Sequence, residues 1–127
     1  MQWIRNIIEK IIPKKERSFQ EIYDNIGIFQ YTENGFKIKY ENISEELKWT
    51  DILQINVYKR DMMTTDRITM EIIYQNNRLT LSEDLAGWFQ FVLKTKEIFP
   101  SIPKQWDFEI IQPPFERNFR IIYQKGQ

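Results

Sequence analysis

From about residue 26 onward, apolar and polar residues alternate in short runs, and this period of two restricts the fold more than any other feature. Successive side chains of a β-strand point to opposite faces, so the alternation predicts strands with one buried and one solvent-facing side. Phe36, Ile38 and Tyr40, for example, alternate with two lysines and a glutamate. Because the connections between runs are short, we predict antiparallel strands in a bent sheet.

About seven strands are expected from these runs. Asn34 and Gly35 predict a tight hairpin turn, because primed turns need the positive φ that these residues tolerate. The predicted strands cover residues 28–32, 36–41, 47–50, 52–60, 68–74, 79–81 and 119–123. The residues expected to share a face within one strand are Leu47 and Trp49; Leu53, Ile55 and Val57; Ile68, Met70, Ile72 and Tyr74; and Phe119, Ile121 and Tyr123.

Two segments with helical periodicity accompany the sheet. Residues 83–99 predict an amphipathic helix that packs across it, with Ser82 as the N-cap. Residues 2–12 predict an N-terminal helix that ends at Pro13. The apolar stripes are Leu85, Trp88, Phe89, Val92 and Leu93 in the first segment, and Trp3, Ile4, Ile7, Ile8, Ile11 and Ile12 in the second.

The chain of 127 residues is predicted to form a single α+β domain. We divide it into an N-terminal helix with a basic joint over residues 1–17 and a body over residues 26–124. Its 18 Lys and Arg residues balance its 18 Asp and Glu residues. A zero net charge argues against broad nucleic-acid binding, which requires an excess of cations.

The absence of two residue types excludes several classes of chemistry. The sequence has no Cys and no His, so thiolate catalysis, a Ser–His–Asp triad and the common zinc sites are ruled out. Carboxylates, lysines and tyrosines remain, which leaves a carboxylate-dependent hydrolase as a remote alternative. We predict that the chain is not an enzyme and binds no cofactor.

Two acidic pairs are the candidates for a metal site. Asp61 and Asp66 flank a predicted loop, and Glu83 and Asp84 are a second pair that can fold against it. Four carboxylates can hold a hard cation, but their spacing lacks the pattern of a calcium loop. The alternative is that the first pair caps the turn through hydrogen bonds to the backbone, and we predict no metal site.

Trp106 and Phe115 lie in irregular segments near prolines, where core packing explains an aromatic residue less well than it does on a helix stripe. We therefore expect these two residues in an exposed aromatic patch, a common anchor for a protein partner. A set of cationic residues on the predicted strands is interleaved with acidic residues and is expected to form a solvated sheet face, with a phosphate-binding face as the alternative. Its members are Lys37, Lys39, Lys48, Lys59 and Arg60.

The predicted N-terminal helix carries a basic flank that includes Lys14 and Lys15. An apolar face beside basic residues is typical of a helix that lies on a membrane surface. The alternative is that this face packs on the body or on a second copy of the chain. No apolar run is long enough to span a bilayer, and no signal peptide is recognised, so we predict a cytoplasmic protein.

A series of short motifs lies within residues 47–124. In order they are Trp49-x-Asp51-Ile52, Val57-Tyr58-Lys59-x-Asp61, Thr65-Asp66, Leu81-x-Glu83-Asp84, Gly87-Trp88, Trp106, Pro114-Phe115-x-x-Asn118 and Tyr123. This series is similar to small uncharacterised bacterial proteins with the PH-like fold, some of which are associated with immunity to toxins. The resemblance implies a two-sheet sandwich closed by a helix, although here a last strand follows the helix. It implies no phosphoinositide site, because the paired basic residues of such sites are not evident between Tyr31 and Lys37.

We predict a non-catalytic protein-binding module, and the resemblance implies an immunity-type protein that neutralises a toxin. Asp61, Asp66, Trp106 and Phe115 are the predicted binding residues, with charges that speed encounter and aromatic anchors that slow release. The alternatives are an adaptor that associates with a membrane surface through the N-terminal helix and a chain that forms homo-oligomers through the same helix.

Overall fold

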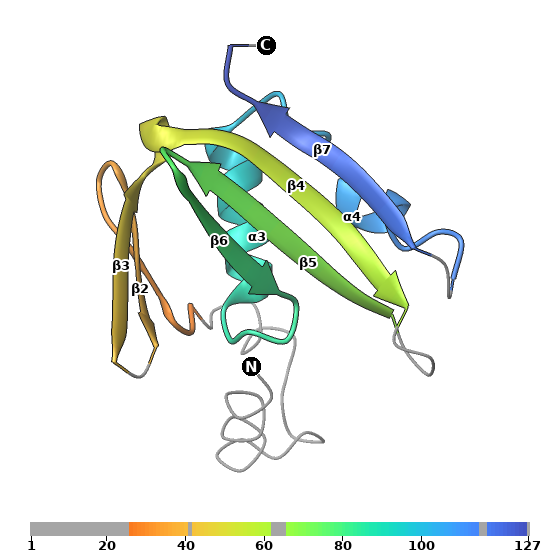
Figure 1. Ribbon diagram of the computed structural model, residues 1–127, viewed down its shortest axis with the longest axis horizontal. Helices are drawn as coiled ribbons and strands as arrows, with labels where there is room; N and C mark the ends of the chain where they lie inside the picture. Colours follow the sequence, from red (N-terminus) through yellow and green to blue (C-terminus); the bar gives the residue numbers. More distant parts are fainter. Residues whose placement is uncertain (1–25, 41, 62–65, 115–116, 127) are drawn as a thin grey trace.

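The computed structural model describes residues 26–40, 42–61, 66–114 and 117–126, which form an α+β fold (Figure 1). One antiparallel sheet contains β1 (Phe29–Tyr31), β2 (Gly35–Tyr40) and β3 (Ile43–Lys48). The other contains, in spatial order, β6 (Asn77–Ser82), β5 (Asp66–Tyr74), β4 (Ile52–Asp61) and β7 (Asn118–Gln124). The other elements within the described residues are the 3-10 turn η2 (Trp49–Asp51) and the helices α3 (Trp88–Ile98) and α4 (Trp106–Glu109). The alternation therefore predicted the class and the antiparallel order correctly.

Two separate sheets form instead of one bent sheet, because η2 interrupts the chain between β3 and β4. Within each sheet, strands that are neighbours in the sequence pair as hairpins. β7 is the exception, since it pairs with β4 only after the chain has formed both helices. This long-range pairing brings the far end of β4 beside the start of β7.

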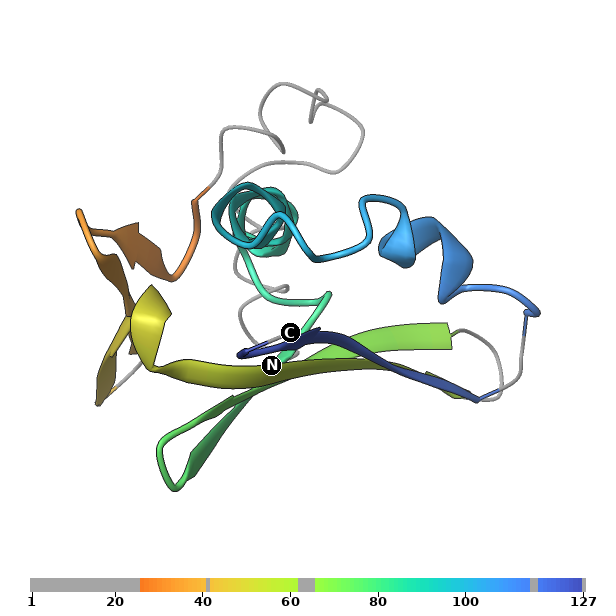
Figure 2. The same ribbon diagram turned by 90° about the horizontal axis from the view of Figure 1, so that it is seen from above.

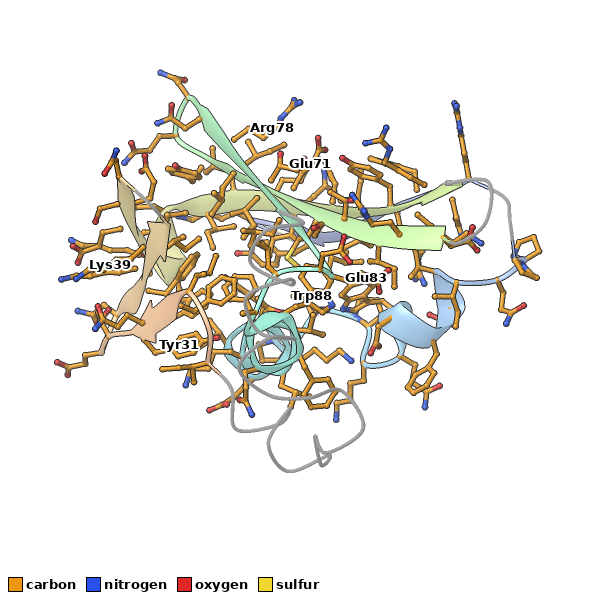
Figure 3. All side chains as sticks on the ribbon, turned by 90° about the horizontal axis from the view of Figure 1, so that it is seen from below. Tyr31, Lys39, Glu71, Arg78, Glu83 and Trp88 are labelled. Atoms are coloured by element: carbon orange, nitrogen blue, oxygen red, sulfur yellow. The ribbon has the colours of Figure 1, made fainter. Side chains whose placement is uncertain are left out.

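Both helices cover the same face of the four-stranded sheet, and the three-stranded sheet stands at its side (Figure 2). We call the covered side the inner face and the opposite side the outer face. The apolar core fills the space between the inner face, the helices and the small sheet, where Phe36, Ile55 and Phe91 are each 0% exposed. Figure 3 shows Glu71 and Arg78 on the outer face, away from α3.

Aromatic rings dominate the core where the small sheet meets α3. The ring centroid of Phe91 lies 4.5 Å from that of Phe29 and 5.0 Å from that of Phe36. Trp49 adds a contact at 4.8 Å to Phe36. Such pairs add stability beyond the apolar area that they bury, so Phe91 is the residue through which α3 is held to the small sheet.

The central helix begins later than the sequence predicts, at Trp88 instead of residue 83. Ser82 ends β6 and does not cap a helix. Gly87 is the N-cap residue and has a φ of 91°, a value that disfavours residues with a side chain. Glu83 accepts a hydrogen bond from the backbone N–H of Ile68 at 3.1 Å, so this acid serves the turn before the helix.

The residues of α3 that face the core also differ from the predicted stripe. The predicted stripe omits Phe91, which is fully buried, and includes Phe89, which is 37% exposed. Phe91, Val92 and Thr95 are the buried residues of α3, with the three- and four-residue spacing of one helical face.

Bulges overturn two of the expected strand faces. Ile52 is 0% exposed and Leu53 is 42% exposed, because the register of β4 against β5 shifts between residues 52 and 54. In β7, Phe119 and Ile121 are exposed and Ile122 is buried. Ile122 has no partner in the register with β4, so this extra residue reverses the sidedness of the strand.

Gly35 does not supply the positive φ that the Asn-Gly pair predicts, because it is already the first residue of β2. Its contribution is a close approach of two backbones. A Cβ atom at this position would lie 1.9 Å from the carbonyl oxygen of Leu47. In the turn between β5 and β6, Gln75 has a positive φ, at 50°.

Candidate functional site

The predicted binding residues do not come together as a surface. Trp106 is 0% exposed and belongs to the core, so the expectation that it forms an exposed aromatic patch is wrong. Phe115 lies outside the described residues, and so does the side chain of Asp61. The predicted N-terminal helix also lies outside them, with Trp3, Ile4, Ile7, Ile8, Ile11, Ile12, Lys14 and Lys15.

Asp66 is the predicted binding residue that the structure places in a charged cluster. Its backbone lies opposite that of Asp61 at the end of the β4–β5 hairpin. Its Oδ2 lies 3.5 Å from Nζ of Lys59. The neighbouring acid Asp84 forms an ion pair of 2.9 Å with Arg67. The described residues contain no group of three or more acids placed to hold a metal ion.

Lys59 is the charged residue that sequence reasoning misplaced. It was expected on a solvated sheet face, but its side chain is 0% exposed. Its amino group donates to the backbone carbonyls of Ile111 and Pro113 and forms the ion pair with Asp66. A buried ammonium requires such partners because leaving water is costly. The lysine therefore ties the segment after α4 to the inner face.

Asn118 completes this connection from the neighbouring strand. Its Nδ2 donates to the carbonyl of Ile110 at 3.3 Å and to that of Gln112 at 3.1 Å. Arg120, two residues later, forms an ion pair of 2.7 Å with Glu109 at the end of α4. Polar contacts thus fix the position from which β7 begins.

Beside this connection lies a hollow of about 560 Å³ at the end of the four-stranded sheet. Arg60 and Arg117 both line it and are exposed, and neither forms an ion pair with a described residue. The described residues that line it are Tyr58, Lys59, Arg60, Arg117, Asn118 and Phe119, with no acid among them. The hollow is therefore suited to an anionic group, because a guanidinium binds a carboxylate through paired hydrogen bonds.

Two large apolar side chains extend this region along β7. Phe119 is 57% exposed and Ile121 is 48% exposed, and both lie on the outer face because they pair with Tyr58 and Asn56. We define the Phe119 surface as Tyr58, Arg60, Arg117, Phe119 and Ile121. It combines exposed apolar area with cations, which is the composition of many protein interfaces.

Internal polar contacts occupy the centre of the outer face. Asn56 donates to Glu71 at 3.3 Å and accepts a hydrogen bond from Gln54 at 2.7 Å. Arg78 forms an ion pair of 3.4 Å with Glu71. The apolar and uncompensated cationic groups are therefore concentrated on the β4–β7 side of this face.

The two tyrosines whose pKa is raised lie on other strands than the residues of the Phe119 surface. Burial raises the pKa of Tyr31 in β1 to about 12. Burial also raises the pKa of Tyr74, and the negative charge of Glu45 adds to the shift. Neither residue belongs to the Phe119 surface, so neither supplies it with an acid or a base.

No protein-family model, no curated protein and no solved structure matches this chain. Within the described ranges, no helix combines the length and the apolar character needed to cross a bilayer. The arguments for function therefore come from the residues of the site.

Proposed function

We propose that the chain is a non-catalytic protein-binding module whose partner docks on the Phe119 surface. The observation that carries the proposal is the exposure of Phe119 and Ile121 side by side on a strand at the edge of a sheet. Exposed apolar side chains that adjoin each other mark binding surfaces more reliably than scattered ones do. The arginines beside them suit an interface, where this residue type is enriched.

The use of charged groups within the fold supports a non-catalytic role. Lys59 is enclosed and engaged by two carbonyls and an acid, whereas a catalytic base must reach its substrate. Two acids are engaged as well, Asp66 with Lys59 and Asp84 with Arg67. These pairs hold segments together, which favours a scaffold over a reaction centre.

We extend the proposal to a PH-like body with an immunity-type role, as the sequence resemblance implies. Two antiparallel sheets with a helix packed across one of them are compatible with that fold. β7 follows the helices, whereas the usual plan ends in its helix. A partner of the Phe119 surface would therefore contact a strand that the usual plan lacks.

Site-specific photo-crosslinking in the native host tests the docking proposal. We expect a crosslinker at Phe119 to capture one defined protein, and a crosslinker at Thr80 to capture none. Thr80 is the matched control because it is exposed on the outer face at the opposite edge, on β6. Equal capture at both positions, or no adduct at Phe119, would contradict docking there. Capture of only a second copy of the chain would replace the partner with self-association.

Protection against a toxin tests the immunity role. Cells that produce a secreted toxin encoded beside this gene should grow when the chain is present and stop when it carries Phe119→Asp. The variant should lose at least about tenfold in affinity for the toxin, because it places a charge in the apolar centre of the interface. Growth that does not depend on the chain would remove the immunity role.

A further inference from the structure

We propose that β7 accepts an extended, acidic segment of the partner as an additional strand of the four-stranded sheet. This inference rests on the proposed function and specifies the chemistry of the partner. The geometry behind it is the position of β7 at the end of the order β6-β5-β4-β7. The strand has β4 on one side, and no other described strand pairs with it.

An edge strand of this length presents a row of backbone N–H and C=O groups to a second chain. β7 runs over Asn118–Gln124, long enough for several ladder hydrogen bonds. Proteins that recognise peptides by strand addition gain affinity from those bonds and specificity from alternate side chains. On the outer face, those alternate side chains would pack beside Phe119 and Ile121 as cross-strand neighbours.

The charges around β7 favour acidic residues in the added strand. Arg60 and Arg117 line the hollow at the start of β7, without an ion pair to a described residue. Arg120 is already used by Glu109, which leaves these two guanidiniums for a partner. A carboxylate of the added strand that entered the hollow would gain charge-assisted hydrogen bonds.

The same charges disfavour a second copy of this chain as the added strand. A two-fold antiparallel pairing centred on Ile121 places Arg117 of one copy opposite Lys125 of the other. Like charges directly opposite each other destabilise a strand pair, so an acidic segment of a different protein is the better occupant.

Binding of defined peptides to the full chain tests the inference. The probe is a short, capped peptide whose outer-facing, alternate residues are valine beside Phe119 and Ile121 and glutamate at the end that reaches Arg117, and its binding is followed by fluorescence anisotropy. We expect it to bind, to weaken as salt is added, and to protect the β7 amides from hydrogen exchange. Charge reversal at Arg60 and Arg117 (Arg60→Glu with Arg117→Glu) should lower the affinity by at least about tenfold through lost charged hydrogen bonds.

Two control peptides separate strand addition from simple charge attraction. One replaces every glutamate with lysine, and the other carries N-methyl groups on alternate amides, which blocks ladder hydrogen bonds. Neither should bind. Equal binding of the N-methylated peptide would overturn strand addition, and equal binding of the lysine peptide would overturn the acidic preference. Near-ultraviolet circular dichroism checks that the arginine variant remains folded, as expected for two exposed side chains.

The two proposals fail in different ways. If Phe119 crosslinks to one protein but the acidic peptide does not bind, the strand-addition inference is wrong and the docking surface remains. If the peptide binds but the crosslinker at Phe119 captures no protein in the host, β7 does accept an acidic strand, and the proposed function fails.

Discussion

The two ends of the core are held together by different forces. At the small sheet, Phe29, Phe36 and Phe91 pack as aromatic rings with centroids 4.5 to 6.3 Å apart. At the far end of β4, the buried amino group of Lys59 and the amide of Asn118 bind backbone carbonyls. Apolar packing is non-directional, whereas a buried charge requires each partner in its place. The first end therefore supplies stability, and the second fixes where β7 starts.

The largest loss is expected at the aromatic end. Phe91→Ala should lower the free energy of unfolding by about 4 kcal/mol, because it opens a cavity where three aromatic contacts meet. Phe89→Ala on the same helix is the matched control, since Phe89 is 37% exposed. Urea denaturation measures both. Equal losses would mean that the aromatic cluster is not the main source of stability.

Lys59→Met should have the next largest effect, about 3 kcal/mol, because it leaves two carbonyls and a largely buried acid without their cation. Hydrogen exchange should increase first in residues 110–113 and at the start of β7. Adding Asp66→Asn should recover part of the loss, since it removes the uncompensated charge. If the loss of stability in the double variant equals the sum of the losses in the two single variants, Lys59 and Asp66 do not stabilise each other.

Asn118→Ala tests the polar end without removing a charge. The loss should be about 1–2 kcal/mol, because the amide donates to two carbonyls. Arg117→Ala, next to it in the sequence, is the control and should leave stability unchanged within about 0.5 kcal/mol, as an exposed side chain does. Thermal denaturation compares the two. A greater loss of stability for Arg117→Ala than for Asn118→Ala would mean that Arg117, and not Asn118, holds this segment in place.

The smallest effect concerns a polar group at the aromatic end. The hydroxyl of Tyr31 is buried without a hydrogen-bond partner, so Tyr31→Phe should be neutral or stabilising by up to about 1 kcal/mol.

The same substitution changes the response to alkaline pH. Burial raises the pKa of folded Tyr31 from 10.0 to about 12. The stability that its neutral form contributes is complete below pH 10 and is lost as the pH rises toward 12. Denaturation series across this range should show a smaller alkaline loss for Tyr31→Phe than for the natural chain. Identical curves would mean that Tyr31 is not shielded from water.

Periodicity predicted the strands well because it reports which face a side chain occupies. The same rule applies to Lys59, which has the parity of Ile55 and Val57, and reading it strictly would have placed this lysine on the inner face. The prediction of a solvated lysine followed instead from the rule that lysine side chains are mostly exposed. The burial of Trp106 also has a signal, since Ile102 and Ile110 lie four residues to either side and are buried with it.

Other features depend on how strands pair with each other, which the pattern of a short sequence segment does not show. The bulges at Leu53 and Ile122 follow from registers between strands, and a single sequence does not display a register. Arg60 and Arg117 meet only because β4 pairs with β7, with Lys59 opposite Asn118. The Phe119 surface was therefore missed although most of its residues had been assigned to strands.

The extra residue at Ile122 divides β7 into two parts that tolerate substitution differently. Beyond it, Ile122 and Tyr123 contact the core, and replacing them requires compensation elsewhere. Before it, Phe119 and Ile121 project from the outer face, where substitutions cost little stability. Phe119 and Ile121 can therefore be replaced without disturbing the hydrophobic interior.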